Sequence, residues 1–405
     1  MTAVAYAAEI DFESEALLET SIRFQCPLSP NPLTPRNVFL TGATGFLGAF
    51  LLDELLKKTE ARIYCLVRAA DRAEAYLRIS NHLRGYSLWN ESLAHRIFAI
   101  PGDLSQHNMG LDRAEFSDLA GRIDVIYHNA GWVNMALPYA QLKSANVAGT
   151  REVLRMAGTE VTKPVHFVSS IAVFYTYSWE NGGLLTEADT PIYDPTLRGG
   201  YSKSKWVADR LVAEAQARGL PASIYRPVRI MGHSQTGAMN DTSDLLPLLL
   251  KGCILLGKYP VFDTNITLVP VDYVSRAMVH LAAQEKSWGR AFHFINKTPV
   301  EWRRLMTALR SFGYPLEEVG YDEWWKDLRQ EVRRAGIPLA DKRFLSTLIL
   351  AMTAPHFLFY QRPEMESRYT DEGLNGSGIS CPAVDEALIG TYLAWWRKTG
   401  FLPVC

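Results

Sequence analysis

A tyrosine and a lysine one helical turn apart are the first residues in this sequence that suggest chemistry. Tyr201 and Lys205 lie in the stretch GGYSKSKWVADR, where a helix is expected, so both side chains face one side and can meet one ligand. A phenol is a poor acid–base group near neutral pH, but a neighbouring ammonium favours the phenolate and lowers its pKa toward the working range. Taken alone, the pair is more typical of an ordinary surface helix.

A serine pair upstream makes the interpretation more specific. The apolar stretch HFVSSIAVF is expected to end a strand with Ser169 and Ser170, about thirty residues before Tyr201. A hydroxyl at the carboxyl end of a strand can hydrogen-bond a carbonyl oxygen while negative charge develops on it. The lysine can also hold the ribose of a nicotinamide cofactor. One serine, Tyr201 and Lys205 are therefore the predicted catalytic set.

A glycine-rich turn near residue 42 predicts the cofactor site. The stretch NVFLTGATGFLGAF places Gly42, Gly45 and Gly48 between an expected strand and an amphipathic helix. Such glycines permit a positive φ, a close approach to pyrophosphate and tight helix–strand packing. The helix N-terminus then offers free N–H groups to the phosphates. The residues predicted to bind a dinucleotide here are Thr41, Gly42, Thr44, Gly45, Phe46, Leu47 and Gly48.

The end of the second expected strand, CLVRAADR, indicates which dinucleotide binds. An NAD site expects an acidic residue near this point to accept hydrogen bonds from the ribose, but Arg68 stands there and Asp71 follows three residues later. A guanidinium pairs well with a 2′-phosphate. The sequence therefore predicts NADPH rather than NADH. Arg78 is a second candidate for the same phosphate, or else a solvated helix arginine.

The remaining cofactor predictions follow other strand ends. Asp103 and Leu104 are expected to border the adenine, although Asp103 also suits a simple turn. Asn146 either hydrogen-bonds backbone near Lys205 or lies at a helix kink. The other predicted contacts are Asn129 and Ala130 after the fourth strand and Pro227, Val228 and Ile230 after the sixth. No metal ligands are predicted.

Alternating strand and helix patterns predict an α/β fold with a doubly wound parallel sheet of Rossmann type. Strands are expected within residues 37–41, 62–67, 96–104, 124–131, 164–170 and 221–230. The predicted divisions are an N-terminal linker and helical segment (1–36), an NADP-binding domain (37–300, with a substrate-region insertion at about 235–270) and a smaller helical substrate domain (301–405). The tryptophan-rich final region either shapes a substrate pocket or only packs.

Composition excludes several functional classes. The 405 residues carry a formal net charge of −1, which gives no electrostatic reason to expect nucleic acid or an anionic membrane as a partner. Five scattered cysteines argue against a disulfide framework and a zinc site, and suit the cytoplasm. The N-terminus lacks the features of a signal peptide. The uncharged stretch 344–361 is expected to be a buried or lid helix rather than a membrane span, and the protein is expected to be a monomer.

The chain resembles an extended short-chain dehydrogenase/reductase. More narrowly, it is similar to the thioester reductase domains that end nonribosomal peptide synthetases, carboxylic acid reductases and fungal aminoadipate reductases. The segments that carry the resemblance are VFLTGATGFLGAFLLDELL, CLVRA, GDLS, HNAGWVN, NVAGT, FVSSIAVF, GGYSKSKWVAD, YRPVRIMGHSQTGAMN and VPVDYVSRA. The segment DFESEALLETSIRF is similar to the linker that enters such domains from a carrier protein.

The resemblance implies a reaction. An acyl or peptidyl chain held on a carrier protein as a phosphopantetheine thioester takes a hydride from NADPH, and the hemithioacetal collapses to an aldehyde and a free thiol. Some relatives reduce the aldehyde further to an alcohol. Tyr201 would protonate the oxygen, Lys205 would hold the ribose and tune Tyr201, and Ser170 matches the family's VS[ST] pattern better than Ser169 does.

Departures from the family pattern leave points open. Val228 stands where the family has glycine, and Trp132 after Gly131 is bulkier than usual and is expected to narrow the acyl pocket. Gly199 and Gly200 are expected to make room for a pantetheine arm. Two alternatives also remain: a sugar-nucleotide epimerase or hydroxysteroid-type dehydrogenase using the same catalytic set, and a protein that senses NADP(H) without chemistry.

Overall fold

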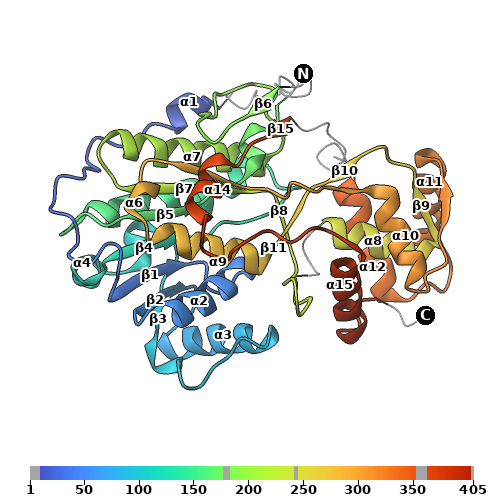
Figure 1. Ribbon diagram of the computed structural model, residues 1–405, viewed down its shortest axis with the longest axis horizontal. Helices are drawn as coiled ribbons and strands as arrows, with labels where there is room; N and C mark the ends of the chain where they lie inside the picture. Colours follow the sequence, from blue (N-terminus) through green and yellow to red (C-terminus); the bar gives the residue numbers. More distant parts are fainter. Residues whose placement is uncertain (1–9, 177–182, 241–244, 353–362, 403–405) are drawn as a thin grey trace, which may run out of the picture.

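A seven-stranded parallel sheet forms the centre of the larger part of the molecule (Figure 1). The computed structural model describes residues 10–176, 183–240, 245–352 and 363–402. The strand order β12-β7-β5-β4-β1-β2-β3 reverses direction between β1 and β4, as in a doubly wound sheet. The strands are β1 (Asn37–Thr41), β2 (Arg62–Val67), β3 (Ile97–Pro101), β4 (Val125–His128), β5 (Val165–Val168), β7 (Ala222–Pro227) and β12 (Ala291–Phe294). The Rossmann-type prediction is confirmed.

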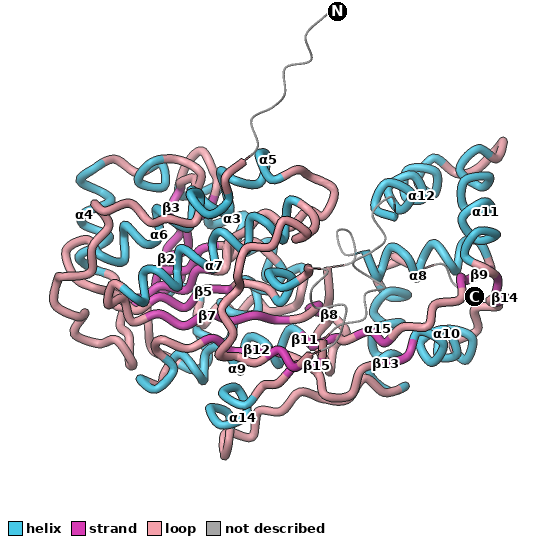
Figure 2. Tube along the Cα trace, turned by 90° about the horizontal axis from the view of Figure 1, so that it is seen from above, coloured by secondary structure: helices cyan, strands magenta, loops and turns pink. Residues whose placement is uncertain are grey.

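Helices cover both faces of this sheet (Figure 2). They bury the central strands completely, and Val38, Phe39 and Leu40 of β1 have no exposed surface. A strand buried on both faces reads as a continuous apolar run, which is why NVFLT and its counterparts could be predicted. The covering helices are α2 (Phe46–Lys58), α3 (Arg72–Gly85), α4 (Arg113–Arg122), α6 (Gly149–Gly158), α7 (Gly200–Ala217) and α9 (Val271–Ala282).

Two features of the sheet differ from the expectation. The edge strand β12 was not predicted, because the chain leaves the sheet after Pro227 and returns only at Ala291, beyond the regular alternation of strands and helices. The expected sixth strand, 221–230, divides after Pro227. Its second part, β8 (Arg229–Met231), leaves the sheet and pairs with β11 (Leu268–Pro270). The chain therefore turns away from the sheet at the point where the second domain begins.

The N-terminal segment belongs to the core of the sheet domain. Helix α1 (Phe12–Glu15) is capped by Asp11, whose carboxylate accepts from the backbone N–H groups of Glu13 and Ser14. The apolar residues of this segment are buried in the same cluster as the sheet: Phe12, Ala16, Leu18, Ile22 and Phe24. Residues 10–24, expected as part of a linker and helical segment, therefore form a packed arm that contains a short helix.

A second hydrophobic core lies beside the first, on the right in Figure 1. It buries Trp302, Trp324 and Trp396 almost completely. Its helices are α8 (Leu245–Leu256), α10 (Trp302–Ser311), α11 (Tyr321–Arg333), α12 (Leu339–Met352) and α15 (Glu386–Lys398), with the short strands β9 (Lys258–Pro260) and β14 (Glu317–Val319). Residues 245–260, expected within the NADP-binding domain, thus share a core with the C-terminal helices.

A later segment returns from the second core to the sheet domain. β15 (Glu364–Met365) pairs in parallel with β6 (Leu184–Leu185), and α14 (Arg368–Leu374) packs beside β12 and α9. Leu374 is buried in the core of the sheet domain. The packing therefore divides the chain differently from the boundaries at 300 and 301, because residues distant in sequence complete each core.

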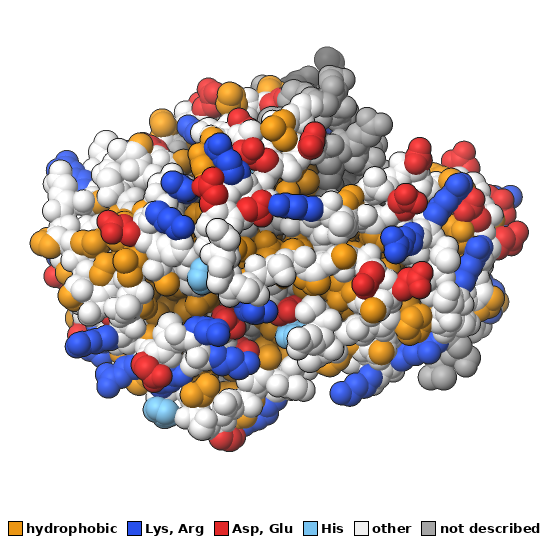
Figure 3. Space-filling model, viewed as in Figure 1, with side chains coloured by type: hydrophobic (Ala, Val, Ile, Leu, Met, Phe, Trp, Pro, Cys, Tyr) orange, Lys and Arg blue, Asp and Glu red, His pale blue; other side chains and the backbone are white. Residues whose placement is uncertain are grey.

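The uncharged stretch 344–361 is described only in part. Its first residues belong to α12, where Leu345, Leu348 and Met352 are buried in the second core, while residues 353–362 lie outside the described residues. None of the helices in the described ranges is long and apolar enough to cross a membrane. On the face shown in Figure 3, basic and acidic side chains are interspersed rather than gathered into a field of one sign.

Candidate active site

The glycine turn between β1 and α2 is built so tightly that side chains are excluded. Gly42 has a φ of 80°, and a Cβ there would lie 2.8 Å from the backbone of Ala130. A Cβ on Gly48 would lie only 1.8 Å from the carbonyl oxygen of Gly42. Gly45 is the N-cap of α2 and supplies no capping side chain. The first N–H groups of α2 therefore face the turn, an arrangement that binds phosphate.

A cavity of about 250 Å³ opens at this turn, at the carboxyl ends of β1 to β4. Eight predicted cofactor residues line it: Thr41, Gly42, Thr44, Gly45, Arg68, Asp103, Leu104 and Ala130. Six further residues complete the lining: Leu66, Val67, Gly102, Gly131, Trp132 and Ala145. Val67, Gly102, Gly131 and Ala145 each adjoin a predicted residue, so including the neighbours of every predicted residue would have found these four.

Other predicted residues support the turn from behind. The Asn129 side chain donates to the carbonyl oxygen of Gly42 at 3.3 Å. Thr41 Oγ1 accepts from the backbone N–H of Ala130 at 3.1 Å and lies 2.8 Å from Nδ1 of His128, a buried residue that the sequence did not single out. Phe46 and Leu47 pack into the protein, Leu47 with 7% exposure. These residues hold strand ends and helix in register.

The two arginines near the second strand lie together. Arg68 lines the cavity, and the guanidinium of Arg78 on α3 hydrogen-bonds to the backbone carbonyl of Arg68. Asp71 is the N-cap of α3 and accepts from the N–H of Glu74 at 2.8 Å. The acidic group nearest to this strand end is therefore used to cap a helix.

The predicted catalytic side chains meet beyond β5. Ser170 begins a short 3₁₀ turn (Ile171–Phe174), accepts from the N–H of Ala172 at 3.2 Å and lies beside Tyr201, whose pKa it lowers. Ser169 points elsewhere, because its hydroxyl donates to the buried carboxylate of Asp209 at 2.6 Å. Lys205 Nζ donates to the backbone carbonyl of Val168 at 2.8 Å. One serine thus lies beside the tyrosine, and its neighbour is structural.

Burial shifts the pKa values of this pair in opposite directions. It raises the pKa of Tyr201 to about 12, although the neighbouring hydroxyl of Ser170 lowers it in part. It lowers the pKa of Lys205 to about 8, against the opposing charge of Asp209. The sequence-based expectation that Lys205 brings the tyrosine pKa downward is therefore wrong for this structure, because desolvation of the phenolate dominates. At neutral pH, Tyr201 is protonated and Lys205 carries its charge.

Asn146 satisfies both interpretations that the sequence left open. It lies in a π-helical turn (Ser144–Ala148), which is the expected kink. Its side chain accepts from the N–H of Trp132 at 2.6 Å and donates to Ser204 Oγ at 2.9 Å. A Cβ on Gly131 would lie 3.1 Å from Lys205 Nζ. Asn146 thus fixes the loop that carries Gly131 beside the lysine.

Gly200, directly before Tyr201, does not make room for a ligand arm as expected. A Cβ on Gly200 would lie 2.3 Å from the carbonyl oxygen of Leu137 and 2.5 Å from the backbone nitrogen of Tyr139. Gly200 therefore permits close backbone packing. Val228 is likewise buried, with its N–H bonded to the carbonyl of Phe294 at 3.0 Å. Pro227 ends β7, Ile230 lies in β8, and neither is among the described lining residues of the cofactor cavity.

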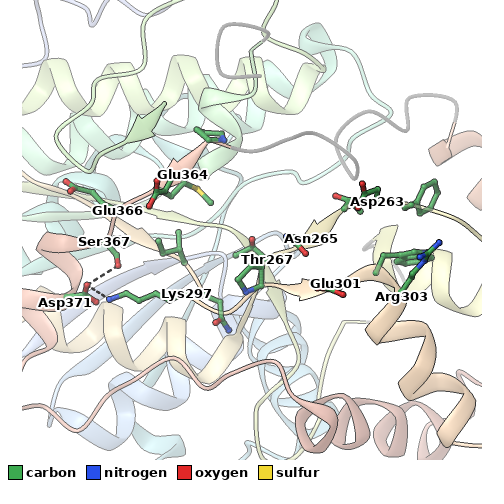
Figure 4. A pocket seen from close by; sticks show the side chains of 18 of the residues that line it. Asp263, Asn265, Thr267, Lys297, Glu301, Arg303, Glu364, Glu366, Ser367 and Asp371 are labelled. Carbon is green, nitrogen blue, oxygen red and sulfur yellow. Dashed lines mark hydrogen bonds and ion pairs between the residues drawn. The ribbon is translucent and has the colours of Figure 1, made fainter. Parts of the chain in front are cut away.

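A larger cavity of about 1370 Å³ lies between the two cores (Figure 4). Figure 4 shows Lys297 paired with Asp371 on one side, at 2.6 Å, and Asp263 and Arg303 on the other. Among its described lining residues, none belongs to the predicted cofactor or catalytic set. The predicted cofactor residues therefore line the smaller cavity, at the glycine turn, and not the larger one.

Comparison with known proteins agrees with this geometry, which is that of a dinucleotide-binding oxidoreductase fold. A family of NAD-binding domains described as Male sterility protein matches residues 40–278. The chain belongs to this family, and a nicotinamide dinucleotide is the cofactor that the family binds.

Several relatives match nearly the whole chain. It is 38% identical over 400 residues to one of the linear gramicidin synthase subunits of Brevibacillus parabrevis, covering 98% of this chain and 8% of that protein. It is 34% identical to the L-2-aminoadipate reductase large subunit of Eremothecium gossypii, covering 98% and 30%. The crystal structure of the terminal R domain from the myxalamid PKS-NRPS pathway matches with 41% identity and a TM-score of 0.90, covering 96% and 98%. The chain thus spans a minor part of the two curated relatives.

Proposed function

We propose that this protein is an NADPH-dependent reductase that releases an acyl or peptidyl chain from a phosphopantetheine thioester as an aldehyde. The observation that carries the proposal is the placement of Ser170 beside Tyr201, with Lys205 one helical turn further on, beyond the glycine turn of the cofactor cavity. The similarity to a terminal reductase domain and to an aminoadipate reductase supports the same reaction class.

The preference for NADPH over NADH rests on the end of β2. Arg68 lines the cavity where a 2′-phosphate would lie, and the nearby carboxylate of Asp71 is occupied in capping α3. A guanidinium forms strong charge-assisted hydrogen bonds with phosphate, whereas a carboxylate would be required to bind a free ribose hydroxyl. Gly42 and Gly48 let strand, turn and helix pack backbone to backbone, since a Cβ at either position would meet protein backbone. The N-terminus of α2 is thereby held at the turn, where its N–H groups can bind a pyrophosphate.

The reaction needs a hydride at the thioester carbon and a proton at its oxygen, and the dinucleotide supplies the hydride when bound. The protein supplies the proton. Tyr201 is a suitable donor because its raised pKa keeps the phenol protonated at neutral pH. Ser170 holds the same oxygen, and the charged Lys205 binds the ribose and attracts the developing negative charge. Collapse of the hemithioacetal then gives the aldehyde and the thiol.

Substitution of Tyr201 tests the catalytic assignment. Tyr201→Phe removes the proton donor and keeps the ring, so NADPH oxidation with an acyl-pantetheine thioester should nearly stop while NADPH binding stays intact. The measurement is absorbance of NADPH for turnover and fluorescence titration for binding. Retained turnover would remove Tyr201 from the mechanism.

Substitution of Arg68 tests the cofactor assignment. Arg68→Ala should raise the KM for NADPH about 10- to 100-fold, which corresponds to the loss of charge-assisted hydrogen bonds, and should leave the KM for NADH unchanged. Arg72→Ala is the matched control, because Arg72 begins α3, is exposed and is not among the described lining residues of the cavity. Equal effects on both cofactors would contradict the assignment.

A carrier protein is the proposed partner, motivated by the likeness of residues 11–24 to a carrier-linked segment and by the similarity to part of a peptide synthase. We expect a carrier-bound thioester to react with a higher kcat/KM than the same acyl group on free pantetheine. A panel of acyl-thioesters, with products measured by mass, would also show whether reduction stops at the aldehyde. Equal rates for carrier and pantetheine thioesters would count against the carrier.

A further inference from the structure

The first turn of α7, which carries Tyr201, begins without a capping side chain. Its N-cap is Gly199, with a φ of 75°, and no side chain of the described residues makes an N-terminal capping hydrogen bond there. An uncapped helix start is less well held than a capped one. Packing against the outside of the helix must therefore hold Tyr201 in place.

Four aromatic rings from separate segments pack around this turn. Phe12 of the N-terminal arm meets Tyr139 of α5 (Tyr139–Lys143) edge-on at 4.8 Å between centroids and stacks on Tyr193 at 5.3 Å. Tyr193 in turn meets Trp206 of α7 at 5.3 Å. We call Phe12, Tyr139, Tyr193 and Trp206 the aromatic clamp. Phe12 joins the two sides of the clamp, because it contacts both tyrosines.

Two contacts connect Phe12 to the residues on either side of Tyr201. Lys203 Nζ lies 5.2 Å from the centroid of the Phe12 ring, within range of a cation–π interaction. The backbone of Tyr139 lies directly against Gly200, where no Cβ would fit. A shift of the Phe12 ring would therefore be transmitted to α7 both before and after Tyr201.

The arm that carries Phe12 is itself fixed along α7 (Figure 1). Glu15 pairs with Lys143 of α5 at 2.5 Å. Farther along, the N–H of Leu18 donates to the Glu214 carboxylate, and Arg218 donates to the Leu18 carbonyl, both at 2.6 Å. The arm thus has its own anchors, one on α5 and one at the C-terminal end of α7, and its position does not depend on Phe12 alone.

We propose that Phe12 is a positioning residue for Tyr201, through which the N-terminal arm sets the geometry of proton donation. The proposal rests on the proposed function and adds a residue far from the catalytic set in sequence. A displacement of a proton donor by about 1 Å can lower turnover about 100-fold. The cofactor cavity lies elsewhere, and Phe12 is not among its described lining residues.

Phe12→Ala tests the proposal in the full chain. We expect kcat per NADPH-binding site to fall about 10- to 100-fold while the Kd for NADPH stays within twofold of the wild type. Phe12→Tyr, which keeps the ring, should retain most of the activity. Leu17→Ala is the matched control, because Leu17 lies in the same arm and is 63% exposed. It should behave as the wild type.

Hydrogen exchange, followed by mass spectrometry without any substrate, gives an independent readout. In Phe12→Ala, the amides of residues 200–206 should exchange faster, while those of β1 and α2 should not change. An unchanged kcat per binding site, or exchange that rises equally throughout the domain, would show a merely structural role and overturn the proposal. Failure of the wild type to reduce any thioester would refute the proposed function. The exchange measurement, which needs no substrate, would still show whether Phe12 holds the start of α7 in place.

Discussion

The buried ion pair between α7 and β7 is expected to be costly to break. Asp209 lies one helical turn after Lys205, and its side chain has no exposed surface, while that of Arg226 is 3% exposed. The guanidinium makes two hydrogen bonds to the carboxylate, at 3.0 and 2.9 Å. Ser169 adds a third at 2.6 Å. Removing one partner would leave the other charge buried without compensation.

The magnitude follows from this burial. Asp209→Asn keeps the shape of the side chain and removes its charge, so the free energy of unfolding should fall by about 3–5 kcal/mol. Ser169→Ala removes one hydrogen bond to the same carboxylate and should lower it by only about 1–2 kcal/mol. The double variant Asp209→Leu with Arg226→Met removes both charges and should recover most of the loss caused by Asp209→Asn.

Urea unfolding followed by circular dichroism and by tryptophan fluorescence is the suitable assay. Three tryptophans are buried in the second core, so the fluorescence reports strongly on that core, whereas circular dichroism reports on both. The loss should appear in the transition of the sheet domain. A loss of unfolding free energy below about 1 kcal/mol for Asp209→Asn would refute the reasoning. So would a double variant whose loss equals the sum of the losses of Asp209→Leu and Arg226→Met measured singly.

Three further predictions concern the site. Gly48→Ala should abolish NADPH binding in a fluorescence titration, because its Cβ would overlap the Gly42 carbonyl; binding within twofold of wild type would contradict this. Since burial lowers the pKa of Lys205 to about 8, its ammonium is lost as the pH rises through 8, and kcat/KM should fall there; a flat profile to pH 10 would exclude a role for that charge. Gly131→Ala should push Lys205 Nζ aside and lower kcat about tenfold in steady-state assays, and unchanged kcat would show that the lysine adapts.

The sheet and the cofactor turn could be read from the sequence because their signals are local. Each central strand is a short apolar run that ends in polar residues, and the glycines at 42, 45 and 48 lie between one such run and a helix. The edge strand β12 could not be predicted in this way, since the chain leaves the sheet after β7 and returns only at residue 291, beyond the regular alternation of strands and helices. The divisions between domains could not be predicted either. Residues 245–260 pack in the second core, and residues 363–374 return to the sheet domain, so each core is completed by residues distant in sequence.

What the sequence determined by itself is the set of groups available for chemistry: the glycine turn, Arg68 at the end of the second strand, and Tyr201 one turn before Lys205. Only the tertiary structure decided where their side chains point and how their pKa values shift. It turned Ser169 toward Asp209 and Ser170 toward Tyr201, because neighbouring residues of an extended chain face opposite ways. It also set the direction of the tyrosine pKa, since desolvation depends on everything packed around a group and not on its neighbours in sequence. The contact of Phe12 with Lys203 at the start of α7 is also decided only by the tertiary structure, because it joins residues almost two hundred positions apart.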